Sequence, residues 1–535
     1  MTMEEEKIYQ DKIFMLALAA AVFFLSPALW FKFTMDQALC NYSVWVWKTY
    51  HLPPYLGVWD QSFPGIFLLR RAMSAVFGES IFGFRLFDFL VQLSVCAMIY
   101  HLTKRLSGSR PAGFLAGVFY AIYYAGLGSR ETGEREGYIF WLLLIALIAG
   151  LRWKERLWLR ASLVGLLLGF AFLLKPFYGL SWPVFGIWFL AEGIKTRPRK
   201  VFLELPVYAF FCLVPAALVI LYYWQLGSVK ELYQATILYN FEVYRGSAAP
   251  NLSHLSSLNL IFHILHKDYI QQPLILFPAL LIIVFLLLNQ ASVRDKKLFR
   301  ILLALIAVSL ISYRMQAKYF PDHLTPFIGL MTIFSGLGLA GIANFLKGSG
   351  SAWRDRIISA VFYPGVLVIM IAGINPQLID YFAFDYFRPW AQVYSSGDSF
   401  DAQYFRTAKS LEPLLRKEKE IGYFGWHPLL PYLLKKKLPS RFCNVYHLLI
   451  RGTDGELSSL QKQWIREYTE AVIKDRPKFF LVADYVPDWD VFNLKSPGLK
   501  QAMHEQFPEL ESFVRENYQL YLSNSLLEVY VYYGK

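Results

Sequence analysis

Two apolar runs separated by a single Lys-Pro pair make up the stretch WLRASLVGLLLGFAFLLKPFYGLSWPVFGIWFLAE, residues 158–192. The runs 158–174 and 177–192 carry almost no charge, and each approaches the roughly 20 apolar residues that a helix needs to cross a bilayer core about 30 Å thick. Pro176 has no backbone N–H and interrupts a helix, so we expect Lys175 at the break between two helices. This stretch predicts two consecutive membrane spans.

Blocks of the same kind recur along the chain. It has 535 residues, of which 56% are hydrophobic and 17% charged, whereas soluble proteins carry about 25% charged residues. An apolar stretch at 62–77 is interrupted by two arginines and is expected to be an interfacial helix. The predicted fold class is therefore an α-helical polytopic membrane protein. We expect eleven spans, at 13–31, 80–103, 111–127, 137–151, 158–174, 177–192, 202–224, 272–289, 298–313, 323–345 and 357–375.

The positions of the basic residues predict the orientation. The net charge is +13, but the Lys and Arg residues gather in short loops between alternate spans, which argues against a nucleic-acid partner. With a cytoplasmic N-terminus, every inside loop carries three or four cations, as the positive-inside rule requires. The long loops 32–79 and 225–271 and the C-terminus then face outward. We expect a multi-pass plasma membrane protein, in a bacterial inner membrane.

From about residue 380 the composition becomes mixed. Strands are expected at YFGWHP (423–428), KFFLVADY (478–485) and LLEVYVYYG (526–534), and helices at 400–419, 457–474 and 497–518. These elements predict two domains, a transmembrane domain over 1–378 and a soluble extracytoplasmic α/β domain over 379–535. The cysteines indicate neither a disulfide framework nor a metal site, because they are scattered without ligand spacing, at Cys40, Cys96, Cys212 and Cys443.

Two acids of the first outer loop are candidate catalytic residues. An ionisable group at membrane depth costs about 2.5–3.5 kcal/mol, so charged residues near the outer ends of spans are normally paired or used. Asp36 follows the first span on an expected amphipathic helix with Tyr42 and Trp45, and Asp60 precedes a Phe-Pro-Gly turn. A carboxylate near the bilayer surface in an aromatic setting is suited to act as a general base. The alternative is a helix cap or a solvated loop acid.

Cations from several separate segments fall on the same predicted outer side. Their simplest alternative role is snorkelling to lipid headgroups. Lys175 is the hardest to explain in that way, because almost no loop surrounds it. Together these segments predict a cavity that holds an anion. The candidates are Arg85, Arg130 and Arg135 in SRETGERE (129–136), Lys175, and Arg314, Lys318 and His323 in YRMQAKYFPDHLTP (313–326).

The order and sidedness of these motifs resemble the GT-C membrane glycosyltransferases, specifically the branch with protein O-mannosyltransferases and the lipid A aminoarabinose transferase. The resemblance covers most of the membrane part and extends to the soluble outer domain. It rests on an acid soon after the first span, a Pro-containing loop before an interfacial helix, FGES-x4-RL (77–86), SRETGERE, GLLLGFAFLLKPFYGL (165–180) and KYFPDHLTP (318–326).

The resemblance implies roles for individual residues. The family's catalytic aspartate falls on Asp36, although relatives usually have Asp-Glu where this chain has Asp36-Gln37. The second family acid falls near Asp60. The substrate-binding lysine falls on Lys175, and further contacts fall on Lys318 and His323. The acid after the third span is Glu131, Glu134 or Glu136, with Glu134 preferred. Apart from the resemblance, Arg85 and Arg130 are predicted substrate contacts because they are cations on the same predicted outer side.

Such enzymes are expected to use a polyprenyl-phosphate sugar as donor and a lipid, glycan or protein hydroxyl as acceptor. A phosphate monoester, with a second pKa of about 6, departs without a proton, so no second carboxylic acid is needed. We therefore assign Asp36 as base and Lys175, Arg314 and Lys318 as phosphate clamp. No cofactor is required; an ion shared by Asp36 and Asp60 is the alternative.

Two other functions compete with this one. A lipid-linked oligosaccharide ligase or polymerase would share the outer active site and differ in what it transfers. A polytopic lipid or sugar transporter would place ionisable groups at mid-span. The predicted mid-span regions are nearly free of charge, with Asp88 as the main exception.

Overall fold

The structure is a computed structural model that describes residues 11–245, 293–316, 318, 320–347, 361–362, 364–366, 400–451, 455–483 and 498–534. The chain divides into two compact units, each assembled from three segments. The first comprises Met1–Phe31, Ser80–Leu218 and Ser256–Arg388, and the second comprises Lys32–Glu79, Val219–Leu255 and Pro389–Lys535. The segment 32–79 therefore groups with the C-terminal segment.

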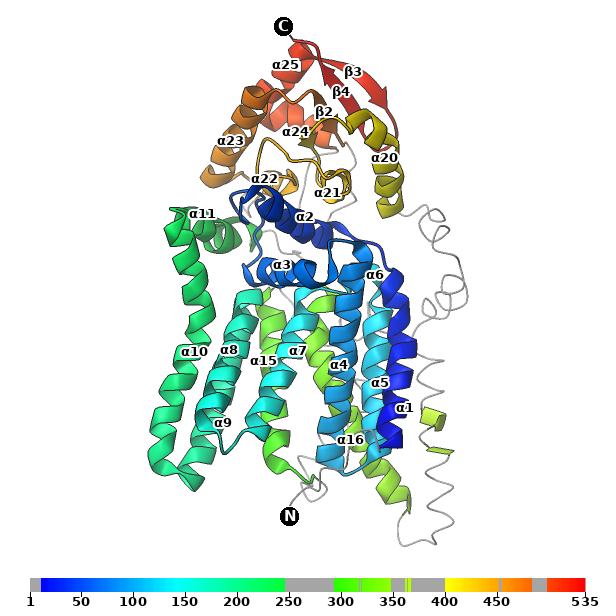
Figure 1. Cartoon of the computed structure of the whole chain (residues 1–535), viewed down its shortest axis with the longest axis vertical. Helices are drawn as coiled ribbons and strands as arrows, with labels where there is room; N and C mark the ends of the chain where they lie inside the picture. Colours follow the sequence, from blue (N-terminus) through cyan, green and yellow to red (C-terminus); the bar gives the residue numbers. More distant parts are fainter. Residues whose placement is uncertain are drawn as a thin grey trace. The chain divides into compact units, whose positions relative to one another are not determined.

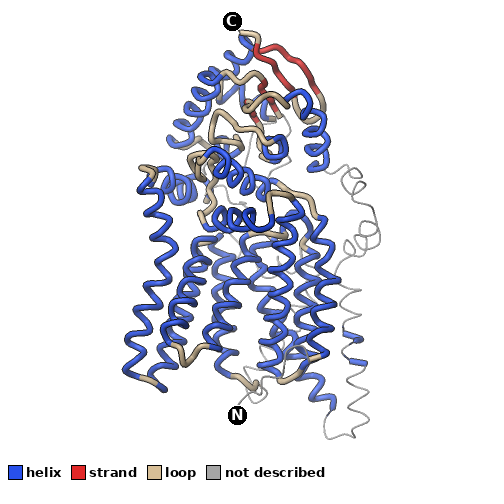
Figure 2. The backbone as a smooth tube through the Cα atoms, in the orientation of Figure 1, coloured by secondary structure: helices blue, strands red, loops and turns tan. Residues whose placement is uncertain are grey.

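The first unit is built from long helices that run side by side (Figure 1), and it contains no strand among its described residues (Figure 2). Six helices of the described part of the chain are long and apolar enough to cross a membrane, so this is a polytopic membrane protein, as predicted. The helices are α1 (Lys12–Leu25, continued by the 3-10 turn Ser26–Trp30), α4 (Ile81–Ser107), α5 (Arg110–Gly126), α6 (Gly128–Glu131), α7 (Arg135–Arg152), α8 (Leu157–Leu174), α9 (Ser181–Thr196), α10 (Pro198–Gln225, which continues into the second unit), α15 (Lys296–Gln316) and α16 (Thr325–Lys347).

The expected spans correspond to these helices where the structure describes them. The spans predicted at 111–127, 137–151 and 177–192 form α5, α7 and α9. The span predicted at 272–289 lies outside the described residues, and the one at 357–375 lies almost wholly outside them.

Small residues allow the helices of the first unit to pack closely. A Cβ added at Gly113 of α5 would lie 2.8 Å from the carbonyl oxygen of Tyr100 on α4, and one at Gly169 of α8 would lie 2.4 Å from that of Cys212 on α10. Helices in lipid lack a hydrophobic force between them and associate through such close backbone contacts. The pairs α4–α5 and α8–α10 are therefore fixed by glycine.

The break at the Lys-Pro pair is present as predicted. Helix α8 ends at Leu174, Lys175 is extended with φ −157° and ψ 115°, and a 3-10 turn over Pro176–Leu180 leads into α9. The residue before a proline is pushed out of the helical region, which accounts for the extended Lys175. The side chain of Lys175 therefore projects from the backbone between two spans.

A buried ion network joins α8, α9 and α10. Arg160 is 1% exposed, and its guanidinium lies 2.8 Å from Glu192 Oε2 and 2.6 Å from Glu204 Oε1. Lys297 of α15 also pairs with Glu192. Buried charges persist only when they are paired in this way, so the network ties the ends of four helices together.

The second unit combines two helices of the segment 32–79 with an α/β fold. The strands form one sheet in the order β1-β2-β4-β3, with β1 parallel to β2 and the other two pairs antiparallel. The elements are α2 (Met35–Tyr50), α3 (Gly65–Phe77), α11 (Val229–Tyr233) with the π-helical turns Gln234–Leu238 and Asn240–Tyr244, α20 (Phe400–Leu415), β1 (Gly422–Phe424), α21 (Leu429–Leu434), α22 (Tyr446–Leu449), α23 (Ser459–Asp475), β2 (Phe479–Val482), α24 (Leu499–Gln506), α25 (Pro508–Asn517), β3 (Tyr518–Ser523) and β4 (Glu528–Tyr532).

The predicted strands and helices of the C-terminal region are present with one correction. The helix expected over 497–518 is two helices, because Pro508 cannot donate an N–H and instead begins a new helix. The residue expected to end that helix, Tyr518, begins β3, a strand that the sequence did not predict.

An aromatic cluster explains why the segments 32–79 and 219–245 group with the C-terminal fold. The ring centroid of Trp59 lies 4.8 Å from that of Tyr239 and 4.9 Å from that of Trp464, and all three side chains are at most 1% exposed. Trp59 lies in the segment 32–79, Tyr239 lies in the segment after α10, and Trp464 lies on α23. Burial of such large rings stabilises the grouping of the three segments.

Candidate active site

Six polar side chains meet in the interior of the first unit, and we call them the buried charge cluster. They come from the start of α7, the break between α8 and α9, the end of α15, the segment after it, and the turn that begins at Pro321. None is more than 9% exposed. The members are Glu136, Lys175, Gln316, Lys318, Asp322 and His323.

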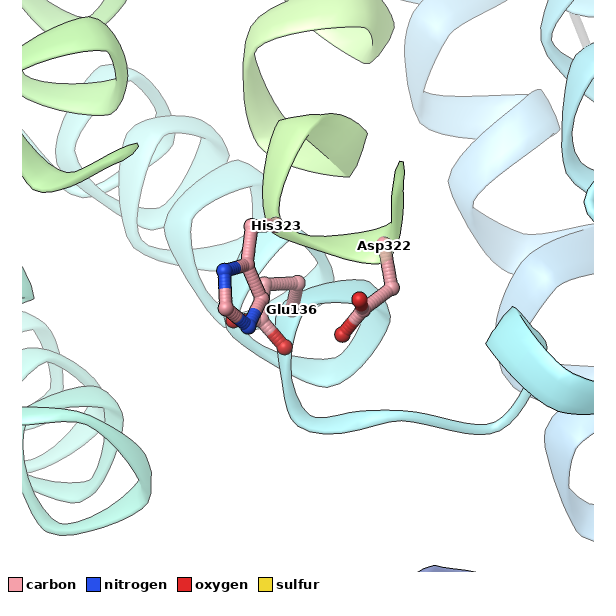
Figure 3. Close-up of side chains that lie close together, drawn as sticks. All are labelled: Glu136, Asp322 and His323. Atoms are coloured by element: carbon pink, nitrogen blue, oxygen red, sulfur yellow. The ribbon is translucent and has the colours of Figure 1, made fainter. Parts of the chain in front are cut away.

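Lys175 and Glu136 form the centre of the cluster. The ammonium of Lys175 donates hydrogen bonds to Glu136 Oε1 and to Gln316 Oε1. His323 Nε2 lies 3.7 Å from the same Glu136 oxygen. Figure 3 shows the Glu136 carboxylate, the His323 ring and the Asp322 carboxylate close to one another. A buried ion pair therefore holds segments from α7, α8 and α15 together.

Several polar atoms of this region have no hydrogen-bond partner among the described residues. They are Glu136 Oε2, Gln316 Nε2, His323 Nδ1 and the hydroxyl of Tyr178, which is fully buried beside the cluster. Buried polar groups in folded proteins are almost always hydrogen-bonded, and exceptions mark sites for water, ions or ligands. The cluster therefore has free donors and acceptors for a polar ligand.

Burial lowers the pKa of both lysines of the cluster, so an anion bound beside them would change their protonation. Burial lowers the pKa of Lys175, and the carboxylate of Glu136 opposes this effect. Burial lowers the pKa of Lys318 to about 7. An anion placed beside either ammonium would stabilise its charged form and raise its pKa.

The cluster also contains donors of the kind that bind a divalent cation. One ligand atom each from Glu136, Asp322 and His323 lies within 4.8 Å of the others. Carboxylate oxygens with one imidazole suit several divalent metals. However, the ammonium of Lys175 already contacts the Glu136 carboxylate, so the cluster supplies a positive charge of its own.

Three other predicted residues of the first unit are Arg85, Arg130 and Arg314. Arg85 is fully buried, and its guanidinium donates to the carbonyl oxygens of Phe31, Ser129 and Thr132. The side chain of Arg130 is 67% exposed, with its Nε 3.6 Å from Glu131 Oε1. Arg314 is half-buried in the last turn of α15.

Glu136, one of the three acids left open by the sequence, accepts a hydrogen bond from Lys175. Glu134 occupies the N-cap position of α7, and Glu131 ends the short helix α6. Because α7 begins at Arg135, Glu136 is its second residue and is completely buried. The preferred Glu134 and the observed Glu136 are two residues apart, which places their side chains on different sides of the helix start.

Asp36 and Asp60 belong to the second unit. Asp36 is the second residue of α2 and is exposed. The preceding Met35 is approached by the C-terminal segment, since its Sδ lies 3.9 Å from Asn444 Nδ2. Asp60 is 2% exposed, and its Oδ1 accepts from the N–H of Ser62 at 3.1 Å, which stabilises the turn before α3.

Three members of this region were not predicted. Gln316 and Tyr178 carry no charge and lie in otherwise unremarkable helical sequence, so only the folded structure identifies them. Asp322 had a usable signal, because it stands beside His323 between a proline and an apolar run. An acid in that position is expected to be paired or used.

Comparison with solved structures defines the class of fold. The chain is similar to ArnT from Cupriavidus metallidurans bound to undecaprenyl phosphate, with a TM-score of 0.56 and 13% identity over 96% of this chain and 97% of that one. It is also similar to the oligosaccharyltransferase of Archaeoglobus fulgidus tethered with an acceptor peptide, with a TM-score of 0.52 and 13% identity over 98% of this chain and 74% of that one. The chain has the GT-C fold.

Comparison with protein families agrees with this fold. Residues 60–223 match the family described as dolichyl-phosphate-mannose-protein mannosyltransferase. A comparison with curated proteins gave no match. The resemblance to GT-C membrane glycosyltransferases that the sequence motifs indicated is therefore confirmed.

Proposed function

We propose that the chain is a membrane glycosyltransferase that moves a monosaccharide from a polyprenyl-phosphate donor to an acceptor hydroxyl. The acceptor is a lipid, a glycan or a protein, and the reaction takes place at the extracytoplasmic face of a bacterial inner membrane. The observation that carries this proposal is the buried charge cluster. It combines two lysines with unpartnered polar atoms at the end of apolar helices, as a lipid-linked phosphate requires.

The donor class is supported by the physics of the cluster and by the comparisons. A phosphate at the head of a long isoprenoid needs cations beside an apolar environment, and Lys175 and Lys318 are both at most 9% exposed. Cations in such a water-poor site stabilise developing negative charge far better than they would in water. The similar ArnT structure contains undecaprenyl phosphate, which is a ligand of this chemistry.

The proposed reaction needs one base and one leaving group. The carboxylate of Asp36 takes the proton of the acceptor hydroxyl, whose oxygen attacks the anomeric carbon from the side opposite the phosphate. The bond between the anomeric carbon and the phosphate oxygen breaks, and the phosphate leaves with the bonding electrons. Lys175, Lys318 and Arg314 stabilise the charge that appears on it. The anomeric configuration is inverted.

Mass spectrometry of lipid-linked sugars tests the function in the cell. Cells that lack the protein should accumulate one polyprenyl-phosphate monosaccharide and lose one sugar from a surface lipid, glycan or protein. Complementation with wild-type protein should reverse both changes, and complementation with Asp36→Asn or Lys175→Met should not. Accumulation of a lipid-linked oligosaccharide would indicate a ligase or polymerase instead, and unchanged lipid-linked sugars would refute the proposal.

A matched control separates loss of a site cation from loss of charge in general. Lys230 is exposed on α11 in the second unit, so Lys230→Met removes the same functional group as Lys175→Met away from the cluster. We expect Lys230→Met to complement as well as the wild type does. Equal failure of the two variants would point to expression or insertion.

A further inference from the structure

Asp88 is a buried carboxylate of α4 that the proposed reaction does not use. It is 1% exposed. The hydroxyl of Tyr124 donates to its Oδ1 and Oδ2 at 2.9 and 3.0 Å, and Gln92 Nε2 donates to its Oδ1 at 3.1 Å. Tyr120 in turn donates to Gln92 Oε1 at 2.7 Å. An acid within a membrane helix is rare unless it has a task.

This network reaches the loop that leads into the buried charge cluster. The oxygen of the Tyr124 hydroxyl accepts the backbone N–H of Gly133 at 2.7 Å. Gly133 has φ +75°, and an added Cβ would lie 2.4 Å from Phe84 Cζ, so no other residue fits without a shift. The chain from Asp88 through Tyr124 therefore fixes the backbone three residues before Glu136.

Arg85 holds the same loop from one turn earlier on α4. Its Nη1 lies 3.0 Å from Thr132 Oγ1 and 3.2 Å from the Thr132 carbonyl oxygen, and its Nη2 lies 3.2 Å from the Ser129 carbonyl oxygen. Residues three apart on a helix share a face. One face of α4 thus presents two polar anchors to the loop 128–133.

The first turn of α7 packs directly on this network. A Cβ added at Gly137 would lie 3.0 Å from Gln92 Nε2 and 3.3 Å from the Tyr124 hydroxyl. Glu136 is therefore flanked by Gly133, whose N–H is bonded by Tyr124, and by Gly137, whose backbone touches the same side chains. Its carboxylate meets Lys175 only while this turn keeps its place.

We propose that Asp88, acting through Tyr124, is a positioning residue that holds the start of α7 so that Glu136 meets Lys175. Hydrogen bonds that follow one another in a chain, as from Gly133 N–H to the Tyr124 hydroxyl and from there to Asp88, polarise and strengthen one another, which makes the network a rigid support. A displacement of a catalytic group by about 1 Å can reduce turnover about 100-fold. The effect on turnover rests on the proposed function, whereas the effect on the loop does not.

Two matched variants test this inference. Tyr120 and Tyr124 are both fully buried on α5, and each hydroxyl donates into the network, but only that of Tyr124 bonds to the loop. We expect Tyr124→Phe to lower donor turnover by about 10- to 100-fold and Tyr120→Phe to change it by about twofold at most. Hydrogen exchange in the peptide that contains Gly133 should rise about tenfold in Tyr124→Phe and much less in Tyr120→Phe.

A second pair of variants applies if Tyr124→Phe does not fold. Asp88→Asn keeps an oxygen that accepts the Tyr124 hydroxyl and should retain most turnover and loop protection, whereas Asp88→Leu should lose both. Equal effects of the two tyrosine variants, or of the two Asp88 variants, would overturn the inference. Absence of donor turnover in the wild-type protein would refute the proposed function instead, and the difference in hydrogen exchange would still decide the positioning role.

Discussion

Replacing Glu136 by glutamine removes the charge of the cluster's central acid and keeps its shape. The glutamine oxygen can still accept the hydrogen bond from Lys175, but the ammonium loses its buried counter-charge. Breaking a buried ion pair in this way costs about 3–5 kcal/mol. Burial already lowers the pKa of Lys175, and Glu136 opposes that effect, so the variant should lower this pKa further. A larger fraction of Lys175 should then be unprotonated at any given pH.

The loss of that charge should be visible in turnover. Removing one group that stabilises charge in a transition state typically lowers kcat by about 100- to 1,000-fold. Because the charged form of a lysine is restored as pH falls through its pKa, the Glu136→Gln variant should recover part of its rate under mildly acidic conditions. The assay is the release of polyprenyl phosphate from a polyprenyl-phosphate sugar by purified protein in lipid nanodiscs, followed at neutral and acidic pH.

A control variant makes the same chemical change at an exposed pair. Glu155 pairs with Arg197, and its side chain is 83% exposed. Exposed ion pairs contribute about 0–1 kcal/mol, so Glu155→Gln should have wild-type turnover. Wild-type turnover by Glu136→Gln at every pH, or a loss that acid does not relieve, would refute the electrostatic role of this acid.

Three further predictions concern other parts of the first unit. Burial lowers the pKa of Lys318 to about 7, so kcat/KM for the donor should fall as pH rises through about 7; Lys318→Arg should remove this dependence, and a flat wild-type profile would contradict it. Arg160→Leu leaves Glu204 buried without this ion-pair partner and removes one of the cations beside Glu192. It should lower the free energy of unfolding by about 3–5 kcal/mol, against less than about 1 kcal/mol for Arg197→Leu. Equal shifts in thermal unfolding would count against the network. Treatment with EDTA should leave turnover unchanged because an ammonium occupies the buried charge cluster, and a loss restored by a divalent cation would show that the cluster works with a metal.

The helical fold could be predicted because its determinants are local. Apolar runs of bilayer length give the spans, and the Lys175-Pro176 pair gives the break between α8 and α9 through the fixed geometry of proline. The strand β3 was missed for a physical reason. Its residues from Gln519 to Ser523 are exposed, so no alternation of buried and exposed positions marks it, and it follows α25 without a glycine or proline between them.

The sequence indicated which residues are candidates for the site, but it indicated less well which of them contact one another. Lys175, Lys318 and His323 were expected from their position beside apolar runs, and all three lie in the cluster. The sequence left Glu131, Glu134 and Glu136 open as the acid after the third span, with Glu134 preferred, and in the structure Glu136 contacts Lys175. The difference depends on the residue at which α7 begins, and sequence patterns locate helix ends only to within a few residues. Gln316 has no pattern of its own and is defined only by tertiary packing.

The central claim is that this chain breaks the bond between a sugar and a polyprenyl phosphate, with Asp36 as base and Lys175 as a phosphate ligand. The most direct test is single-turnover release of polyprenyl phosphate by purified wild-type, Asp36→Asn and Lys175→Met proteins in the presence of a cell-envelope acceptor fraction. The account predicts release by the wild type and a fall of at least about 100-fold in both variants. Release by either variant at the wild-type rate, or no release by the wild type, would contradict it.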